Sequence, residues 1–292
     1  MRLNGKVAIV TGAGTGLGRA AMVLFAKEGA KVIGCGRRQD KGDETVRMVK
    51  AAGGDGIFVQ ADISDSDNVQ HVIAEAVSHY GQLDILVNNA SVGPNGPYNM
   101  GPVTKIPDED WDAVINVNLR GPFLFCKYGI RQMLTTGGGV IVNVSSIGGT
   151  IGMHSNHNYC ASKAGVISLT KCIGASYAAQ GIRANCLVAG SFDSDFIAPY
   201  ATGIKAALAD EQLRYHYNPV GRMSTPEEMA RPLLFLASED SSYMYGECLV
   251  ADGAQTIAPI AAGTDGLRAQ PDEETPPWQC TTPPTPPKPS AL

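Results

Sequence analysis

The sequence predicts a single α/β domain in which helices cover both faces of a doubly wound, parallel sheet of seven strands. Seven short runs rich in β-branched and apolar residues recur along the chain, and segments of helical period separate them. The first four runs are apolar on both faces, as strands buried between two helix layers are. One helix fits between successive runs, which is typical of right-handed βαβ units.

The elements are expected in the following order. The strands should span residues 6–11, 31–35, 56–60, 84–88, 140–145, 182–188 and 247–251. Capping residues mark two helices: Ser64 or Ser66 before a helix over 67–79, and Thr225 before a helix over 226–237.

A change in composition marks the end of the expected domain, residues 1–256. Nine of the chain's 18 prolines lie between residues 259 and 289, where no periodic apolar face remains. Such a segment buries too little apolar surface to fold, so we expect residues 257–292 to be a Pro-rich, disordered tail. Its P-x-x-P steps also fit a ligand for a proline-reading domain, but an inert extension is the simpler expectation.

The overall composition argues against several classes of partner. The net charge is −5, and no Lys/Arg-rich run suggests that nucleic acid is a partner. The apolar run at 7–10 is too short for a signal peptide or a membrane span. Seven scattered cysteines without a C-x-x-C pair suit a reducing compartment, so we expect a cytoplasmic protein with no membrane partner.

A glycine-rich turn, TGAGTGLG at 11–18, follows the first strand and opens a helix. Glycines let the backbone approach a phosphate closely, and the helix N-terminus offers unpaired N–H groups and a positive dipole end. The turn therefore predicts a Rossmann-type dinucleotide site, although close packing of strand on helix is an alternative use of glycine. The expected cofactor contacts in this turn are Gly12, Thr15, Gly16, Leu17 and Gly18.

Two arginines, Arg37 and Arg38, follow the second strand. Dinucleotide folds place an acid here for the ribose 2′-hydroxyl, or an arginine for a 2′-phosphate. No acid precedes Asp40, and a guanidinium binds phosphate bidentately, so the sequence favours NADP over NAD. A solvated arginine pair is the alternative.

Later strand ends supply further expected cofactor contacts, because ligands of parallel sheets gather at the carboxyl edge. Asp62 suits the adenine amine, although capping a turn is an alternative role. The contacts expected at these strand ends are Asp62, Ile63, Asn89, Ala90 and Gly190.

Tyr159 and Lys163 are four residues apart, so they share one face of a helix. A free phenol titrates near ~10, and a neighbouring ammonium lowers that pKa, so Tyr159 is predicted to act as the acid/base. Lys163 is also expected to bind the cofactor's ribose, which makes both residues cofactor contacts. Ser146, at the end of the fifth strand, is expected to donate a hydrogen bond to the substrate oxygen.

Over residues 3–256 the chain resembles the short-chain dehydrogenase/reductase family, whose motifs it carries in the same order and at similar spacing. The motifs are TGAGTGLG, the NNA at 88–90, the NLRG at 118–121, the serine and the YCASK at 159–163. The resemblance implies an NAD(P)-dependent oxidoreductase in which Asn118, rather than Asn116, holds a water in the proton relay. The implied catalytic tetrad is Asn118, Ser146, Tyr159 and Lys163.

The resemblance also implies a homotetramer, built partly through helices at 108–134 and 157–179. The chain departs from the family pattern at Ser91, Ala189, Ser194 and Ala254. None of these departures removes a catalytic side chain, and Ser194 keeps a hydroxyl for the nicotinamide amide.

The loop at 91–107 and the segment at 191–217 are expected to form the walls of the substrate pocket. Both are largely apolar or aromatic, which predicts a medium-sized, uncharged ketone or secondary alcohol. The expected substrate contacts are Ser146, His154, Tyr159, Phe192 and Phe196. The spacing of His154, His157 and Cys160 resembles a metal motif, but no metal site is expected.

Two other functions are compatible with the sequence. One is a 3-oxoacyl carrier-protein reductase; its acidic carrier would favour basic side chains at the site entrance, and the loops at 134–137 and 179–181 carry none. The other is a catalytically silent NADP sensor, which would not need the Tyr/Lys pair.

Overall fold

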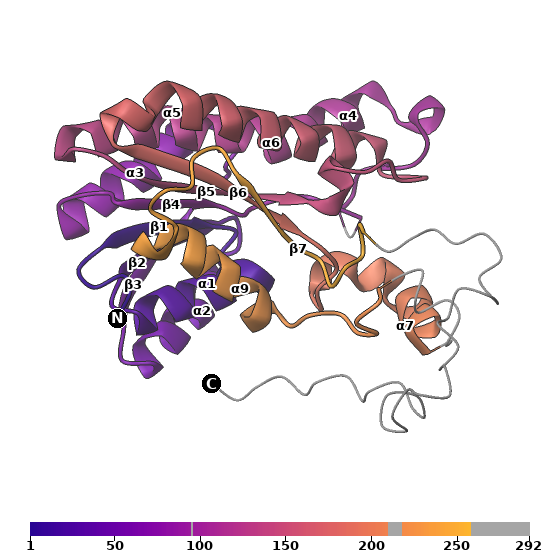
Figure 1. Ribbon diagram of the computed structural model, residues 1–292, viewed down its shortest axis with the longest axis horizontal. Helices are drawn as coiled ribbons and strands as arrows, with labels where there is room; N and C mark the ends of the chain where they lie inside the picture. The colour runs from indigo at the N-terminus through magenta and orange to yellow at the C-terminus, as the bar shows by residue number, and fades with distance from the viewer. Residues whose placement is uncertain (95, 210–217, 258–292) are drawn as a thin grey trace, which may run out of the picture.

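A sheet of seven parallel strands lies between two layers of helices (Figure 1). The computed structural model describes residues 1–94, 96–209 and 218–257. The strand order is β3-β2-β1-β4-β5-β6-β7, with α1, α2 and α9 on one side of the sheet and α3 to α6 on the other. The doubly wound, Rossmann-type fold is therefore confirmed.

Each strand lies within one residue of its expected boundaries. The strands are β1 Val7–Thr11, β2 Lys31–Gly36, β3 Asp55–Gln60, β4 Ile85–Asn88, β5 Gly139–Ser146, β6 Ile182–Ala189 and β7 Cys248–Ala251. The described helices are α1 Gly16–Lys27, α2 Gln39–Ala51, α3 Ser66–Tyr80, α4 Asp108–Ile115, α5 Gly121–Met133, α6 His157–Tyr177, α7 Ala201–Ala209 and α9 Pro226–Ala237.

The central strand β1 shows why these strands carry apolar residues on both faces. Ala8 and Val10 pack in a core with α1 and α9, while Val7 and Ile9 pack in a second core with α3 and α5. Alternate side chains of a strand point to opposite faces, so a strand with helices on both sides needs apolar residues at every position.

One expectation about the helices was wrong. The cap of α3 is Asp65, whose carboxylate accepts hydrogen bonds from the N–H groups of Asp67 and Asn68 at 2.8 and 2.9 Å. A carboxylate also complements the positive helix end, which a serine does not. The helical stretch expected over 108–134 is present, as α4 and α5 joined without a break by a π-helical turn, Asn116–Arg120.

The proposed tail, residues 258–292, lies outside the described residues. Within the described part of the chain, no helix is both long and apolar enough to cross a membrane.

The start of α9 confirms its expected cap. Thr225 and Glu228 form a capping box, in which the Thr225 hydroxyl accepts from the Glu228 N–H and the Glu228 carboxylate accepts from the Thr225 N–H at 2.9 Å. Arg222 donates two more hydrogen bonds to that carboxylate, at 2.7 and 2.8 Å. These contacts, the Arg222 bonds first, lower the pKa of Glu228 to about 2.

Glu228→Gln is expected to destabilise the fold by about 1–2 kcal/mol at pH 7, because it removes a charge-assisted pair and weakens a cap. Since the folded pKa is depressed, this stabilisation is complete above the ordinary value of 4.5 and disappears as the pH falls toward 2. Chemical denaturation at several pH values measures the difference. The exposed neighbour Glu227 offers the control Glu227→Gln, and an equal loss in both variants would contradict the role of the box.

Candidate active site

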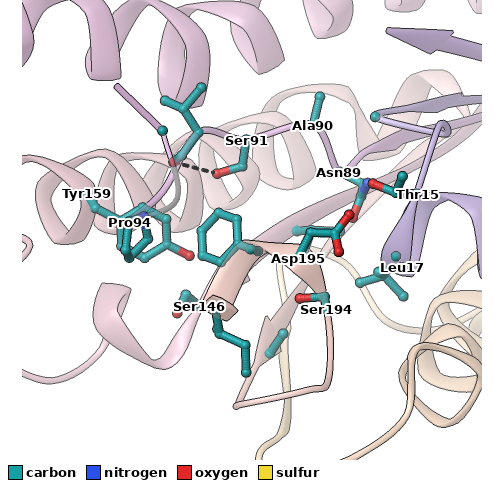
Figure 2. A pocket seen from close by; sticks show the side chains of 18 of the residues that line it. Thr15, Leu17, Asn89, Ala90, Ser91, Pro94, Ser146, Tyr159, Ser194 and Asp195 are labelled. Carbon is teal, nitrogen blue, oxygen red and sulfur yellow. Dashed lines mark hydrogen bonds between the residues drawn. The ribbon is translucent and has the colours of Figure 1, made fainter. Parts of the chain in front are cut away.

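A cavity of about 820 Å³ opens at the carboxyl ends of the strands (Figure 2). In the close view, Tyr159, Pro94 and Ser146 lie on one side, and Thr15 and Leu17 lie on the other. Most expected site residues line it: Gly12, Thr15, Gly16, Leu17, Arg37, Arg38, Asp62, Ile63, Asn89, Ala90, Ser146, Tyr159, Lys163, Gly190, Phe192, Ser194 and Phe196.

Three expected site residues, Gly18, Asn118 and His154, do not line the cavity. Gly18 packs beneath the glycine turn, where a Cβ would overlap the Gly12 carbonyl oxygen. His154 is exposed and does not line the cavity, whereas Met153 beside it does, and the expected substrate contact of His154 stays a prediction.

His157 binds the backbone of a neighbouring loop: its Nδ1 accepts a hydrogen bond from the Val103 N–H at 2.9 Å. Within the described ranges, no group of three or more His, Cys, Asp or Glu side chains is placed to hold a metal ion.

The glycine turn has the geometry of a dinucleotide cradle. Gly12 has φ +68°, and a Cβ there would lie 2.8 Å from Cα of Ala90, so glycine is required on both counts. Thr11 joins the turn to the end of β4, because its hydroxyl accepts from the N–H groups of Asn89 and Ala90, both at 2.9 Å. These bonds fix the glycine turn at the start of α1, where Gly12, Thr15 and Gly16 line the cavity. The residues of this turn fit a bound pyrophosphate.

The far end of the cavity carries charge suited to a phosphorylated ribose. Arg37 and Arg38 are exposed at the cavity edge, and Arg38 Nη2 donates to the Thr15 hydroxyl at 3.4 Å. Asp62 lines the cavity too, but its Oδ1 accepts from the N–H and hydroxyl of Ser64, at 2.9 and 2.7 Å. The alternative role of Asp62, capping a turn, is therefore present, and its contact with adenine stays a prediction.

Lys163 lies one helical turn beyond Tyr159 on the cavity face of α6. Its ammonium is 5.6 Å from the centroid of the Tyr159 ring and donates to the Val144 carbonyl at 3.0 Å. Burial lowers the pKa of Lys163 to about 8. The ammonium of Lys163 is therefore fixed between the end of strand β5 and the phenol ring of Tyr159.

The expectation of a lowered pKa at Tyr159 was wrong for this structure, because burial outweighs any contribution from Lys163. Burial raises the pKa of Tyr159 to about 12, and a hydrogen bond with Ser146 opposes the rise without cancelling it. The ammonium lies by the ring and binds Val144, so burial of the hydroxyl dominates. The hydroxyl consequently stays protonated at neutral pH, which suits a proton donor.

Asn118 lies in the π-helical turn and is fully buried. Its Oδ1 accepts from the N–H of Val92 at 2.8 Å and from the Ser91 hydroxyl at 3.1 Å, and its Nδ2 donates to the Val92 carbonyl at 2.9 Å. The Asn118 side chain thus holds the loop after β4 in place through hydrogen bonds to Ser91 and Val92. The role of Asn118 in a water relay stays a prediction. Such π-turns are frequent at functional sites.

Sequence reasoning missed several residues of the cavity. Pro94, Met153 and Asn156 line it, and Asn156 comes one turn before Tyr159. A polar residue at the start of a helix is a recognisable signal, but it is usually interpreted as a cap.

One argument against a carrier-protein substrate was also wrong: the loops at 134–137 and 179–181 precede β5 and β6, at the edge of the sheet opposite the cavity.

The family model described as "Enoyl-(Acyl carrier protein) reductase" matches residues 12–256. A solved short-chain type dehydrogenase/reductase from Mycobacterium marinum is 30% identical, with a TM-score of 0.80 over 87% of this chain and 96% of that one. The chain belongs to the short-chain dehydrogenase/reductase family.

Two curated relatives of this short-chain dehydrogenase/reductase have named substrates. The cis-4-hydroxycyclohexanecarboxylate dehydrogenase of Sinomonas cyclohexanicum is 36% identical over 86% of this chain and 96% of its own. The 3-oxoacyl-[acyl-carrier-protein] reductase of Thermotoga maritima is 37% identical over 88% of this chain and 100% of its own. The chain is accordingly an oxidoreductase that acts on alcohols or ketones with NAD(P).

Proposed function

We propose that this enzyme interconverts a medium-sized, largely apolar ketone and its secondary alcohol, prefers NADP to NAD, and uses Tyr159 as the general acid/base. The observation that carries the proposal is the convergence of Ser146, Tyr159 and Lys163 on the cavity that the glycine turn also lines. That arrangement supports proton transfer beside a bound dinucleotide.

The geometry supports the following catalytic roles. When bound, NADPH supplies a hydride to the carbonyl carbon. Tyr159 holds its proton at neutral pH and donates it to the carbonyl oxygen, to which Ser146 donates a hydrogen bond as charge develops. The ammonium of Lys163, 5.6 Å from the phenol ring, stabilises the phenolate that remains. Asn118 completes the proposed tetrad by fixing the loop that faces Tyr159.

The cavity wall supports an apolar substrate. Phe196 packs on Tyr159 with 5.7 Å between ring centroids, and Pro94 and Met153 line the same cavity. The named substrate of the Sinomonas relative is a ring alcohol, which such a wall would also accept. Part of the segment expected to form this wall, residues 210–217, lies outside the described residues.

A 3-oxoacyl carrier-protein reductase is the second candidate, because the Thermotoga relative carries that name. A panel of cyclic and linear ketones, with a 3-oxoacyl thioester free and carrier-bound, distinguishes the two when NADPH consumption is followed. Our proposal expects higher kcat/KM for the ketones. Preference for the carrier-bound thioester would replace the proposal with the second candidate, and binding of NADPH without turnover would indicate a sensor.

The arginines after β2 make the cofactor preference testable. Replacing both Arg37 and Arg38 by alanine is expected to lower kcat/KM for NADPH by about 10- to 100-fold, because each charge-assisted contact to a 2′-phosphate is lost. The kcat/KM for NADH should change little and serves as the internal control. An equal fall for both cofactors would contradict binding of the 2′-phosphate by this pair.

We also propose a cytoplasmic homotetramer assembled partly through α5 and α6. Phe123 on α5 is 45% exposed, and an exposed aromatic ring on a helix suits a subunit contact. The six cysteines of the described chain are free thiols, as a reducing compartment requires. Light scattering after gel filtration measures the mass, and a monomer would contradict the assembly.

A further inference from the structure

Cys186 and Cys248 are neighbours on the last two strands of the sheet. β7 is the edge strand and pairs with β6 (Figure 1). The two cysteines are partners in the register of these parallel strands, and both pack in one cluster with Ile147 and Ile167. Adjacent strands lie about 4.8 Å apart, and paired residues point to the same face of the sheet. The two free thiols are therefore within reach of each other.

The spacing of the backbone is compatible with a disulfide between these thiols. Disulfides join Cα atoms that lie about 4.4–6.8 Å apart, and the spacing of neighbouring strands falls in this range. Paired side chains leave the sheet in parallel, so their Cβ atoms keep about the strand spacing, whereas a disulfide needs about 3.8 Å. Closing the bond must therefore pull β7, an edge strand of four residues, toward β6. A strained disulfide of this kind is readily reduced again.

The two thiols have different environments. Cys186 is fully buried, whereas Cys248 is partly exposed on the edge strand. A hydrogen bond from the Cys186 thiol lowers the pKa of Cys248, and the nearby Lys171 ammonium adds to the fall. The same hydrogen bond, together with burial, raises the pKa of Cys186. Because the thiolate is the form that attacks an oxidant, Cys248 should react first and Cys186 second.

The pair is connected to the cavity in two ways. Burial lowers the pKa of Lys163, and Cys186 opposes that fall, so these two side chains interact electrostatically. The strands also run from the cysteines toward the cavity, where Gly190, which lines it, donates to the Ala251 carbonyl of β7 at 2.9 Å. A movement of β7 relative to β6 should therefore reach the active site.

We propose that Cys186 and Cys248 form a redox-sensitive thiol pair, which hydrogen peroxide converts into a disulfide that slows the enzyme. The Cys248 thiolate attacks one peroxide oxygen and becomes a sulfenic acid, while the other oxygen leaves as water with the proton that Cys248 released. The Cys186 sulfur then attacks the Cys248 sulfur, and the sulfenic oxygen leaves as a second water with the Cys186 proton. The two thiols are oxidised by two electrons, which the peroxide accepts, and a dithiol reductant reverses the change.

The test treats the enzyme with a small molar excess of hydrogen peroxide and follows peptide masses and turnover. In the wild type, the peptides that contain Cys186 and Cys248 should become cross-linked with the loss of two hydrogen atoms. The kcat for ketone reduction should fall by about 10-fold or more, because displacements of about 1 Å near reacting groups have effects of this order. Dithiothreitol should reverse both changes, and Cys248→Ser should keep its turnover in peroxide.

Cys172→Ser is the matched control, because Cys172 is an exposed thiol on α6, and this variant should lose and regain turnover as the wild type does. Absence of the cross-link from the wild-type peptides would overturn the inference, even if Cys248→Ser failed to fold. An equal loss of turnover in Cys248→Ser would assign the sensitivity to another thiol, such as Cys160 beside Tyr159, and would overturn it as well. So would a cross-link that leaves turnover unchanged. The cross-link is measured whether or not the proposed ketone substrates are correct.

Discussion

Tyr159→Phe is expected to lower kcat for ketone reduction by about 10³-fold, the typical contribution of a positioned proton donor. The ring that packs on Phe196 remains, so the cavity should keep its shape. The Kd for NADPH should therefore change by less than about threefold, a small free-energy difference. Stopped-flow turnover and a fluorescence titration of NADPH measure the two quantities on the same protein.

Tyr177→Phe is the matched control, because Tyr177 is the last residue of the same helix and does not line the cavity. It removes a phenol hydroxyl from α6 without touching the site, and full activity is expected. If Tyr159→Phe retained wild-type turnover, the assignment of Tyr159 as proton donor would be wrong.

Gly18→Ala is expected to weaken NADPH binding by at least about 100-fold and to destabilise the fold by about 1–3 kcal/mol, the usual cost of overpacking. The new Cβ would overlap the Gly12 carbonyl oxygen and lie 2.7 Å from the Asn89 amide nitrogen. Backbone atoms cannot give way cheaply, so the start of α1 must move away from the turn that holds the phosphates. Thermal unfolding and a titration with NADPH measure both effects.

Gly14→Ala provides a comparison within the same turn. A Cβ at Gly14 would lie 3.2 Å from the Lys41 Cβ and 3.9 Å from the Lys41 carbonyl carbon, and Gly14 does not have a positive φ. A much smaller loss is expected, since a shift of a few tenths of an ångström between the turn and α2 relieves this contact. Equal losses in the two variants would mean that any added methyl group disturbs this turn, rather than a specific close approach at Gly18.

The sheet could be predicted well from the sequence because burial on both faces leaves a local signal. The apolar run of β1 is short, rich in β-branched residues and followed by a glycine-rich turn, and this combination indicates a buried strand. The family motifs also predicted that Ser146, Tyr159 and Lys163 share one cavity, and they do. This prediction succeeds because the end of a strand and the face of a helix determine where such side chains project.

What could not be predicted depends on neighbours distant in sequence. The pKa of Tyr159 is raised because the surrounding chain buries it, and burial is not visible in a four-residue spacing. His154 was expected in the pocket but is exposed and does not line it, and its four-residue surroundings in the sequence carry no sign of that exposure. Asn118 was identified from its motif, yet its contacts with Val92 require the fold of the loop after β4.

The most direct test of hydride and proton transfer in this cavity uses NADPH with deuterium at both positions of the reduced nicotinamide carbon, together with the best ketone of the panel. The alcohol product is analysed by mass spectrometry after turnover by the wild-type enzyme. We predict that one deuterium is bound to the carbinol carbon of each product molecule, while the hydroxyl hydrogen comes from solvent through Tyr159. An unlabelled alcohol, or oxidation of NADPH without formation of an alcohol, would contradict the account.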